Sequence, residues 1–324
     1  MKYKINFNQQ FIVFSLFAFI FTAFSLLLHG FFTIGNIVAL LRTESVLGIL
    51  GLGMAVVVIG RGIDLSMIAL LTVPTGVVLT LVGTGHGFGL SLLAGLALAI
   101  AVAVLNGILV AYAEIPSLFA TLAVGIGLAG VGQSGLFEYD IVPWPKSLNT
   151  IAWIGRGDWH GIPYSVFAFA ATAVVVGIFM RKTQFGLFIY AIGDNPAAAR
   201  IAGISVRPMT ILQYTISALI SVFAGLVLSA SANNMDTRIF NLTWIYDVIL
   251  VVVLGGVGLS GGRGGALNVV GGTLLIGTII NGMTIMNIPY EVQSLIKGVV
   301  LLIAISLDSI INPRNEETAQ QGDI

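Results

Sequence analysis

The chain has 324 residues, of which 57% are hydrophobic and 9% are charged, and its formal net charge is zero. Soluble domains carry about 25% charged residues, so this composition, with a mean hydropathy of +1.02, indicates an integral membrane protein. The zero net charge gives no reason to expect nucleic-acid binding, and the lack of cysteine excludes disulfides, thiolate metal sites and cysteine nucleophiles.

The first apolar run covers residues 12–28 and follows Lys2 and Lys4. No small-x-small cleavage site comes after it, so we interpret it as a retained membrane span and not as a signal peptide. A spanning helix needs about 20 mostly apolar residues. The gaps between charges predict two further spans between 64 and 114 with a turn at 83–89, then 114–138, 158–181, 207–236 and 263–291. Three less clean spans contain charges: about 34–60 contains Arg42 and Glu44, about 242–259 contains Asp247, and about 293–311 contains Lys297 and Asp308.

These segments predict an all-α fold, a polytopic membrane bundle of about ten helices in one domain, residues 1–312, with a polar tail at 313–324. More lysines and arginines fall on the side of the N-terminus than on the other side. The positive-inside rule therefore places both termini in the cytoplasm. The loop at about 136–162 is then extracytoplasmic, and its Tyr139, Trp144, Trp153 and Trp159 suit an interfacial aromatic belt.

Forty glycines are present. Small residues let membrane helices approach closely. The glycine-rich segments 127–132 and 271–282 are therefore expected to be packing surfaces of a tight bundle.

The segment 60–66, Gly-Arg-Gly-Ile-Asp-Leu-Ser, lies between two apolar runs. Arg61 and Asp64 are three residues apart and could pair across a turn, because charges near lipid tend to be paired. Asp64 could also cap the following helix by accepting backbone N–H groups. The two interpretations are compatible.

The segment 190–205, YAIGDNPAAARIAGIS, predicts a short capped helix between the charged residues 181 and 207. Asn195 suits an N-cap and Pro196 the first helical position. Gly203 suits the left-handed residue that ends a helix. Residues 196–202 would measure roughly 10 Å, too short to cross a bilayer. Such a helix could dock against another protein or lie on its own chain as a connector, and the residues alone leave both open.

The glycine-rich segment 254–267 could suggest a phosphate-binding loop, but a Walker A motif needs Gly-Lys-Ser/Thr and the chain contains no Gly-Lys. We interpret it as a tight cytoplasmic turn in which Arg263 is a positive-inside anchor.

Polar residues inside the predicted spans are few. Intramembrane amides usually bond another helix, although some could line a path for a polar solute. Asp247 must face protein or water, as a structural acid or, less plausibly, a proton-coupling carboxylate. The candidates for a translocation path or gate are Asp64, Asn106, Phe119, Thr121, Asp247 and Asn281.

No enzyme chemistry stands out. His29, His86 and His160 are isolated, and no metal motif, catalytic triad or carboxylate pair occurs. We expect no catalytic residues, no metal and no cofactor bound by this chain.

Several segments, in order, are similar to the permease subunits of bacterial ATP-binding-cassette importers for monosaccharides, of the ribose, xylose, arabinose and galactose type. They are GRGIDLS (60–66), LNGILVAYAEIPSLFATLA (105–123), FGLFIYAIGDNPAAARIAGI (185–204), the glycine-rich 251–283 and IKGVVLLIAISLD (296–308). Together they cover nearly the whole chain. The combination is specific, although each glycine pattern alone is weak.

The resemblance implies an inner-membrane permease that pairs with a second permease chain, identical or not. It implies cytoplasmic ATPase subunits that use ATP-Mg, and a periplasmic sugar-binding protein. The segment about 181–207 would hold the coupling helix. Docking to the ATPase would fall to Gly193, Asp194, Asn195, Pro196, Ala199, Arg200 and Gly203.

The chain departs from the family at two places. Arg61 stands where the family usually has a glycine before Ile-Asp-Leu-Ser, and Met67 and Ile68 stand where Val-Gly often follows that motif. The alternative is an ion-coupled secondary transporter or channel for a small polar solute, and Asp64 and Asp247 are its only candidate coupling groups.

Overall fold

The computed structural model describes residues 9–137, 140–241 and 244–311. Ten longer helices make up the body of this part: α1 (Gln9–Leu27), α2 (Ile34–Ile59), α3 (Met67–Gly83), α4 (Phe88–Ala111), α5 (Ser117–Val131), α7 (Tyr164–Lys182), α10 (Val206–Ala232), α11 (Trp244–Leu254), α12 (Ala266–Ile285) and α13 (Tyr290–Ile311). The short elements are α6 (Trp153–Arg156), α8 (Gln184–Asp194), α9 (Pro196–Ile201), the π-helix η1 (Gly132–Leu136), and the 3-10 helices η2 (Lys146–Leu148) and η3 (Thr237–Asn241).

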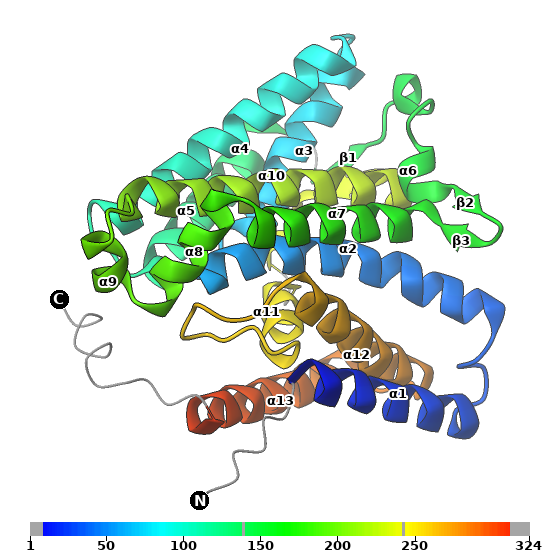
Figure 1. Ribbon diagram of the computed structural model, residues 1–324. Coiled ribbons are helices and arrows are strands. Elements are labelled where there is room, and N and C mark those ends of the chain that lie inside the picture. Colours follow the sequence, from blue (N-terminus) through cyan, green and yellow to red (C-terminus); the bar gives the residue numbers. More distant parts are fainter. Residues whose placement is uncertain (1–8, 138–139, 242–243, 312–324) are drawn as a thin grey trace, which may run out of the picture.

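Helix α2 is the centre of the bundle. Every residue of it from Glu44 to Ile59 is buried, and α7, α10, α11 and α12 pack around it. Figure 1 shows α2 between a group formed by α3, α4 and α10 and a group formed by α1, α12 and α13. A helix apolar on all sides is expected in such a position.

The predicted helical membrane bundle is confirmed, but the number of ten spans is not. Among the described residues, seven helices are long and apolar enough to cross a membrane: α1, α2, α4, α5 with its extension to Ser134, α7, α10 and α12. Helix α3 has 17 residues and α11 has 11. The predicted span 242–259 is therefore wrong in extent, because α11 stops at Leu254 and measures only about 16 Å.

The glycine prediction is correct for one segment and only partly for the other. Along α12, a Cβ at Gly272 would lie 2.0 Å from the Val251 carbonyl oxygen, and one at Gly282 would lie 2.1 Å from the Phe24 ring. In 127–132, by contrast, nothing lies within 4 Å of a Cβ at Gly127 or Gly130. Those two glycines face outward, so only Gly132 of that segment is at a tight contact.

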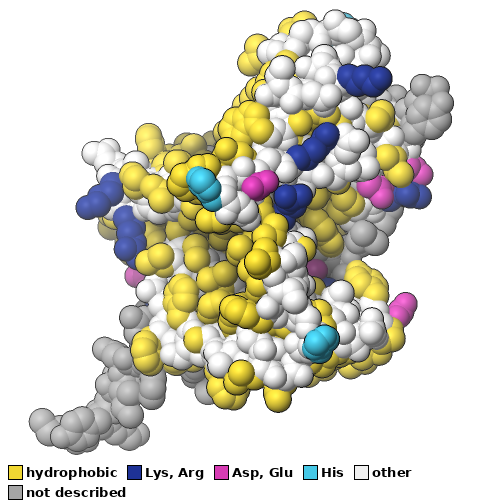
Figure 2. All heavy atoms as spheres, turned by 90° about the vertical axis from the view of Figure 1, so that its right-hand side faces the viewer, with side chains coloured by type: hydrophobic (Ala, Val, Ile, Leu, Met, Phe, Trp, Pro, Cys, Tyr) yellow, Lys and Arg dark blue, Asp and Glu magenta, His cyan; other side chains and the backbone are white. Residues whose placement is uncertain are grey.

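The end of the bundle opposite α9 carries the small sheet structure. Strand β1 (Ile141–Pro143) pairs antiparallel with β4 (Asn234–Asp236), and β2 (Asp158–Trp159) pairs with β3 (Ile162–Pro163) as a hairpin. Figure 1 shows the β2–β3 hairpin and α9 at opposite ends. Figure 2 views the hairpin end, where charged and histidine side chains are spread among hydrophobic ones.

The aromatic-belt prediction for the loop 136–162 is only partly correct. Trp153 and Trp159 are 54% and 55% exposed and so can lie at a membrane surface. Trp144 is buried beneath the Arg156 guanidinium, which leaves it outside any belt. Tyr139, like the tail 313–324, lies outside the described residues.

Candidate functional site

Helix α9 forms as its sequence predicts and is capped at both ends. The Asn195 side-chain oxygen accepts hydrogen bonds from the backbone N–H groups of Ala197 and Ala198, both at 3.0 Å, and Pro196 occupies the first helical position. At the other end Gly203 has φ +81°, and its N–H donates to the Arg200 carbonyl. The Ile204 N–H reaches back to the Ala199 carbonyl, which completes a Schellman motif.

One face of helix α9 is buried against its own chain, and the opposite face is exposed. Ala199 is 4% exposed, whereas Ile201 is 89% exposed. Asp194 and Arg200 are exposed too, and neither takes part in an ion pair within the described part of the chain.

The predicted docking residues lie on two sides of this part of the chain, and their role in docking stays a prediction. Ala199 of α9 and Gly193 of α8 are buried against their own chain. Asp194, Arg200 and Gly203 remain on the exposed side, and Asn195 and Pro196 shape the helix. Ile201, which the prediction did not include, lies on the exposed side as well.

Helix α8, which leads into α9, meets the end of α2 and the loop after α11. We call this place the α9 junction, and its residues are Ile59, Tyr190, Gly193, Gly262 and Gly264. The Gly262 N–H donates to the Ile59 carbonyl at 2.8 Å, and the Tyr190 hydroxyl donates to the Gly264 carbonyl at 2.7 Å. A Cβ at Gly193 would lie 1.8 Å from the Ile59 oxygen. The segments 60–66, 190–205 and 254–267 therefore meet in space.

Tyr190 is suited to hold this junction as a donor. Burial raises the pKa of its phenol above the ordinary value, while the positive charge of Arg181 acts in the opposite direction. The hydroxyl therefore keeps the proton that it donates. The loop that it holds is a tight turn, as predicted, with Gly261, Gly262 and Gly264 in left-handed conformations.

Beyond the junction, Asp64 lies fully buried in a network of hydroxyl groups. Its Oδ1 accepts hydrogen bonds from the N–H and the hydroxyl of Ser66, and its Oδ2 accepts one from the Ser217 hydroxyl at 2.9 Å. The Asn106 side chain donates to the Ser66 hydroxyl at 2.8 Å. The capping prediction is thus displaced by two residues, since Ser66 is the N-cap of α3 and Asp64 fixes Ser66.

The same network anchors the segment 60–66 to α5. The Leu65 N–H donates to the Thr121 hydroxyl at 3.0 Å, and the Ile63 N–H donates to the Ser117 hydroxyl at 3.2 Å. Burial raises the pKa of the Asp64 carboxyl above its ordinary value, and the hydrogen bonds from Ser66 and Ser217 oppose that shift. Asp64, Asn106 and Thr121, predicted separately, therefore belong to one structure.

Asp247 has a different partner. Lys297 of α13 places its ammonium 2.7 Å from Asp247 Oδ1 and 3.0 Å from Oδ2, and both side chains are buried. Glu44 of α2 lies within reach of both charges and is 7% exposed, packed on Gly277. The three predicted spans that contain charges, about 34–60, 242–259 and 293–311, are thus the three that meet here.

The last two candidates for the path lie apart from both clusters. Asn281 and Asn36 exchange two amide hydrogen bonds, at 2.9 and 3.0 Å, between α12 and α2. Phe119 is 64% exposed on the outer side of α5. The expectation that intramembrane amides bond another helix is confirmed for Asn106 and Asn281. The role of the six candidates in a path stays a prediction.

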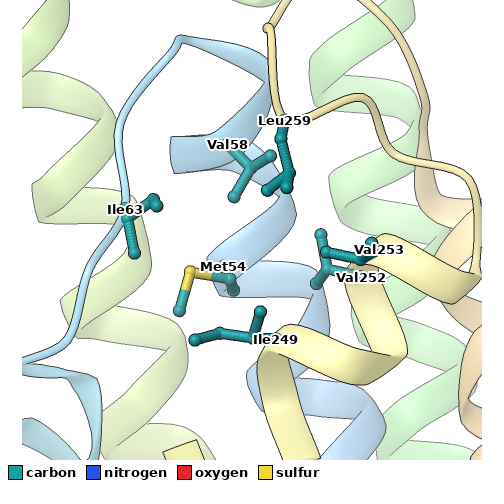
Figure 3. A pocket seen from close by; sticks show the side chains of 7 residues that line it. All are labelled: Met54, Val58, Ile63, Ile249, Val252, Val253 and Leu259. Atoms are coloured by element: carbon teal, nitrogen blue, oxygen red, sulfur yellow. The ribbon is translucent and has the colours of Figure 1, made fainter. Parts of the chain in front are cut away.

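A small apolar hollow, with room for no more than about one water molecule, lies beside the α9 junction. Figure 3 shows its walls, which come from α2, α11 and the two connections. The lining residues are Met54, Val58, Ile63, Ile249, Val252, Val253 and Leu259. No polar side chain lines it, so it offers a sugar no hydrogen bonds. Within the described residues, no cluster of histidine, aspartate and glutamate is placed to hold a metal ion.

Comparison with known proteins gives a consistent answer. Residues 36–305 match a family described as "Branched-chain amino acid transport system / permease component". The chain is 30% identical over 286 residues to the ribose import permease protein RbsC of Escherichia coli K12, covering 88% of this chain and 89% of that protein. It is 32% identical to RbsC of Bacillus subtilis 168, with 84% of each chain covered.

A third relative is the L-arabinose ABC transporter permease protein AraH of Azospirillum brasilense, which is 31% identical over 305 residues, or 93% of this chain and 87% of AraH. No solved structure matches the chain. The resemblance noted from the sequence is therefore confirmed at the level of the family.

Proposed function

The chain belongs to this family of transport permease components, which are not themselves enzymes, and we propose that it is the membrane pore subunit of an importer that carries a monosaccharide or related polyol into the cytoplasm. ATP-Mg would be hydrolysed on separate cytoplasmic subunits. A periplasmic binding protein would deliver the solute. A second permease chain, identical or a sister chain, would complete the pore in the bacterial inner membrane, with both termini of each chain in the cytoplasm.

The observation that carries this proposal is the exposed half of α9. A six-residue helix is too short to be stable alone, yet this one is capped at both ends and packs on α8 and α10. It presents Ile201 at 89% exposure between the exposed Arg200 and Ala202. A rigid apolar anchor with a polar rim is the form of a protein-docking site. The site is suited to transmit movement from an ATPase.

The sugar as solute is supported by the printed functions of the relatives, among them ribose, galactofuranose and L-arabinose permeases. The description of the family names amino acids instead. We prefer the sugar because several individual relatives, each aligned along most of this chain, agree on it.

The ion-coupled alternative has little support from the two carboxylates on which it depends. Asp247 is neutralised by Lys297, and both oxygens of Asp64 accept hydrogen bonds from serines. An ion-binding carboxylate would need oxygens open to an ion path. Neither carboxylate shows this arrangement.

The test is uptake of radiolabelled sugars into proteoliposomes that contain this chain with or without its cognate ATPase and binding protein. We expect uptake only when both partners and ATP are present. Uptake by this chain alone, driven by a proton or sodium gradient, would overturn the proposal. Repeating the assay with a panel of pentoses, hexoses, polyols and branched-chain amino acids would identify the solute, and uptake of amino acids only would overturn the sugar assignment.

A further inference from the structure

Arg61 has a backbone conformation that its side chain disfavours. Its φ is +71°, in the left-handed region where a Cβ meets steric resistance and where glycine is at ease. A residue held in this region against its preference needs surrounding contacts that fix it. The question is therefore what the Arg61 side chain provides that glycine would not.

The Arg61 side chain reaches across to the loop that follows α11. Its Nε donates to the Ser260 carbonyl at 3.0 Å. A Cβ at Gly261 would lie 2.7 Å from Arg61 Cγ, so the aliphatic stem of the arginine lies directly on that glycine. The guanidinium and its stem thus hold the loop 255–265 by one charged hydrogen bond and by packing.

That loop depends on such outside contacts. Four of its glycines, Gly256, Gly261, Gly262 and Gly264, have positive φ values and no side chains to anchor them. The loop is also bonded to Ile59 and Tyr190 at the α9 junction, and the Asn268 side chain donates to its Gly255 carbonyl. Arg61 therefore adds a side-chain link between the segment 60–66 and the loop, next to the backbone bond from Gly262 to Ile59.

The two segments that Arg61 links both line the apolar hollow. Ile63 comes two residues after Arg61, and Leu259 comes one residue before Ser260. Both line the hollow, and Figure 3 shows them on opposite sides of Val58. In the other direction the segment continues to Asp64, which is bonded to Ser217 of α10. A movement of the linked pair would thus reach two walls of the hollow and the buried network.

We propose that Arg61 is a clasp that makes the segment 60–66 and the loop 255–265 move as one unit, so that displacement of α9 reaches both sides of the hollow together. Arg61 is a positioning residue, acting through Ser260 and Ile63 rather than on the solute. The inference rests on the proposed function for its driving force, the docking of an ATPase on α9. It extends that function by naming the residue that passes the movement on.

The test is Arg61→Gly in the complete complex with ATPase, binding protein and ATP. Glycine adopts φ +71° without steric cost, so the variant removes the Arg61 side-chain contacts and introduces no backbone strain. The readouts are the recovery of the ATPase with the permease and the ratio of sugar transported to ATP hydrolysed. We expect full recovery, continued hydrolysis and a fall of about tenfold in the ratio, the order expected for losing one charged hydrogen bond.

A matched control is Asn287→Gly, because Asn287 is exposed, has φ +52° and lies after α12, away from the junction. It should leave the ratio unchanged. Arg61→Lys, which keeps a donor on a flexible stem, should restore part of the ratio lost in Arg61→Gly.

An unchanged ratio in Arg61→Gly would overturn the inference, and so would loss of assembly, which would make Arg61 a folding or docking element. If the unsubstituted chain itself failed to recover the ATPase, the proposed function would fall first. The two failures are therefore distinguishable.

Discussion

Asp64 and Asp247 are both buried aspartates in an apolar bundle, yet they are satisfied by different chemistry. Asp64 accepts hydrogen bonds from Ser66 and Ser217, and the surrounding network extends to Asn106. Asp247 depends on one cation, Lys297. The first arrangement spreads the cost of burial over several neutral groups, whereas the second concentrates it on a single partner.

The difference matters because of where the two aspartates lie. The Asp64 network holds the connection between α2 and α3, which meets the loop after α11, and its neutral donors can be exchanged one at a time. The Asp247–Lys297 pair joins α11 to α13 in the body of the bundle, where water cannot solvate an unpaired charge. We infer that the first region is adjustable and the second is a fixed part of the frame.

Lys297→Met should have the largest effect of the substitutions that test this contrast. It leaves Asp247 buried without a cation, which costs about 3–5 kcal/mol of the free energy of unfolding. The measurement is unfolding in detergent, followed by tryptophan fluorescence.

Two further variants control for charge removal. Lys182→Met, at an exposed position at the end of α7, should change stability little. The double variant Lys297→Met with Asp247→Leu should recover most of the loss, because an apolar pair can replace a buried ion pair. If Lys297→Met were as stable as the unsubstituted chain, the ion pair would not be part of the frame.

Asp64→Ala should have an intermediate effect. It removes the acceptor for the hydroxyls of Ser66 and Ser217, which costs about 1–3 kcal/mol because these buried donors lose their partner. Asp64→Asn keeps one acceptor oxygen and should cost less in the same unfolding assay. A loss in Asp64→Ala as large as that in Lys297→Met would contradict the distinction between the two regions.

Asn281→Leu should have the smallest effect, about 1 kcal/mol, since interhelical hydrogen bonds in membrane proteins are individually weak. Combining it with Asn36→Leu tests the reciprocal pair. The double variant should lose less stability than the sum of the two single variants, because each amide satisfies the other. Simple additivity would show that the amides act independently.

The sequence predicted local structure well where one residue type determines it. Asn195, Pro196 and Gly203 predict α9 to within one residue, because capping depends on neighbouring atoms only. The charge gaps locate α1, α3, α4, α5, α7, α10 and α12, because a membrane span is a run of mostly apolar residues. The end of α11 was missed because the apolar run continues to Val257, while the helix stops where Gly255 must approach the Asn268 carbonyl.

Partners were harder to predict. Nothing in sequence spacing joins Asp247 to Lys297, fifty residues away, or Asp64 to Ser217. One usable signal was present, since three spans carried charges that lipid would not tolerate and these had to meet. Ala199 and Ile201 show the remaining difficulty: a helix of six residues does not reveal from its sequence which face its own chain covers.

The central claim is that α9 docks an ATPase through its exposed face, and the most direct measurement compares Ile201→Asp with Ile162→Asp. Ile162 is 41% exposed in β3, at the opposite end of the chain, so the two variants place the same charge at the two ends. Ile201→Asp should reduce both recovery of the cognate ATPase and ATP-driven sugar uptake by about tenfold or more, as expected for an anchor residue. Ile162→Asp should leave ATPase recovery intact. Normal recovery and uptake with Ile201→Asp, in a chain that folds and inserts normally, would contradict the account.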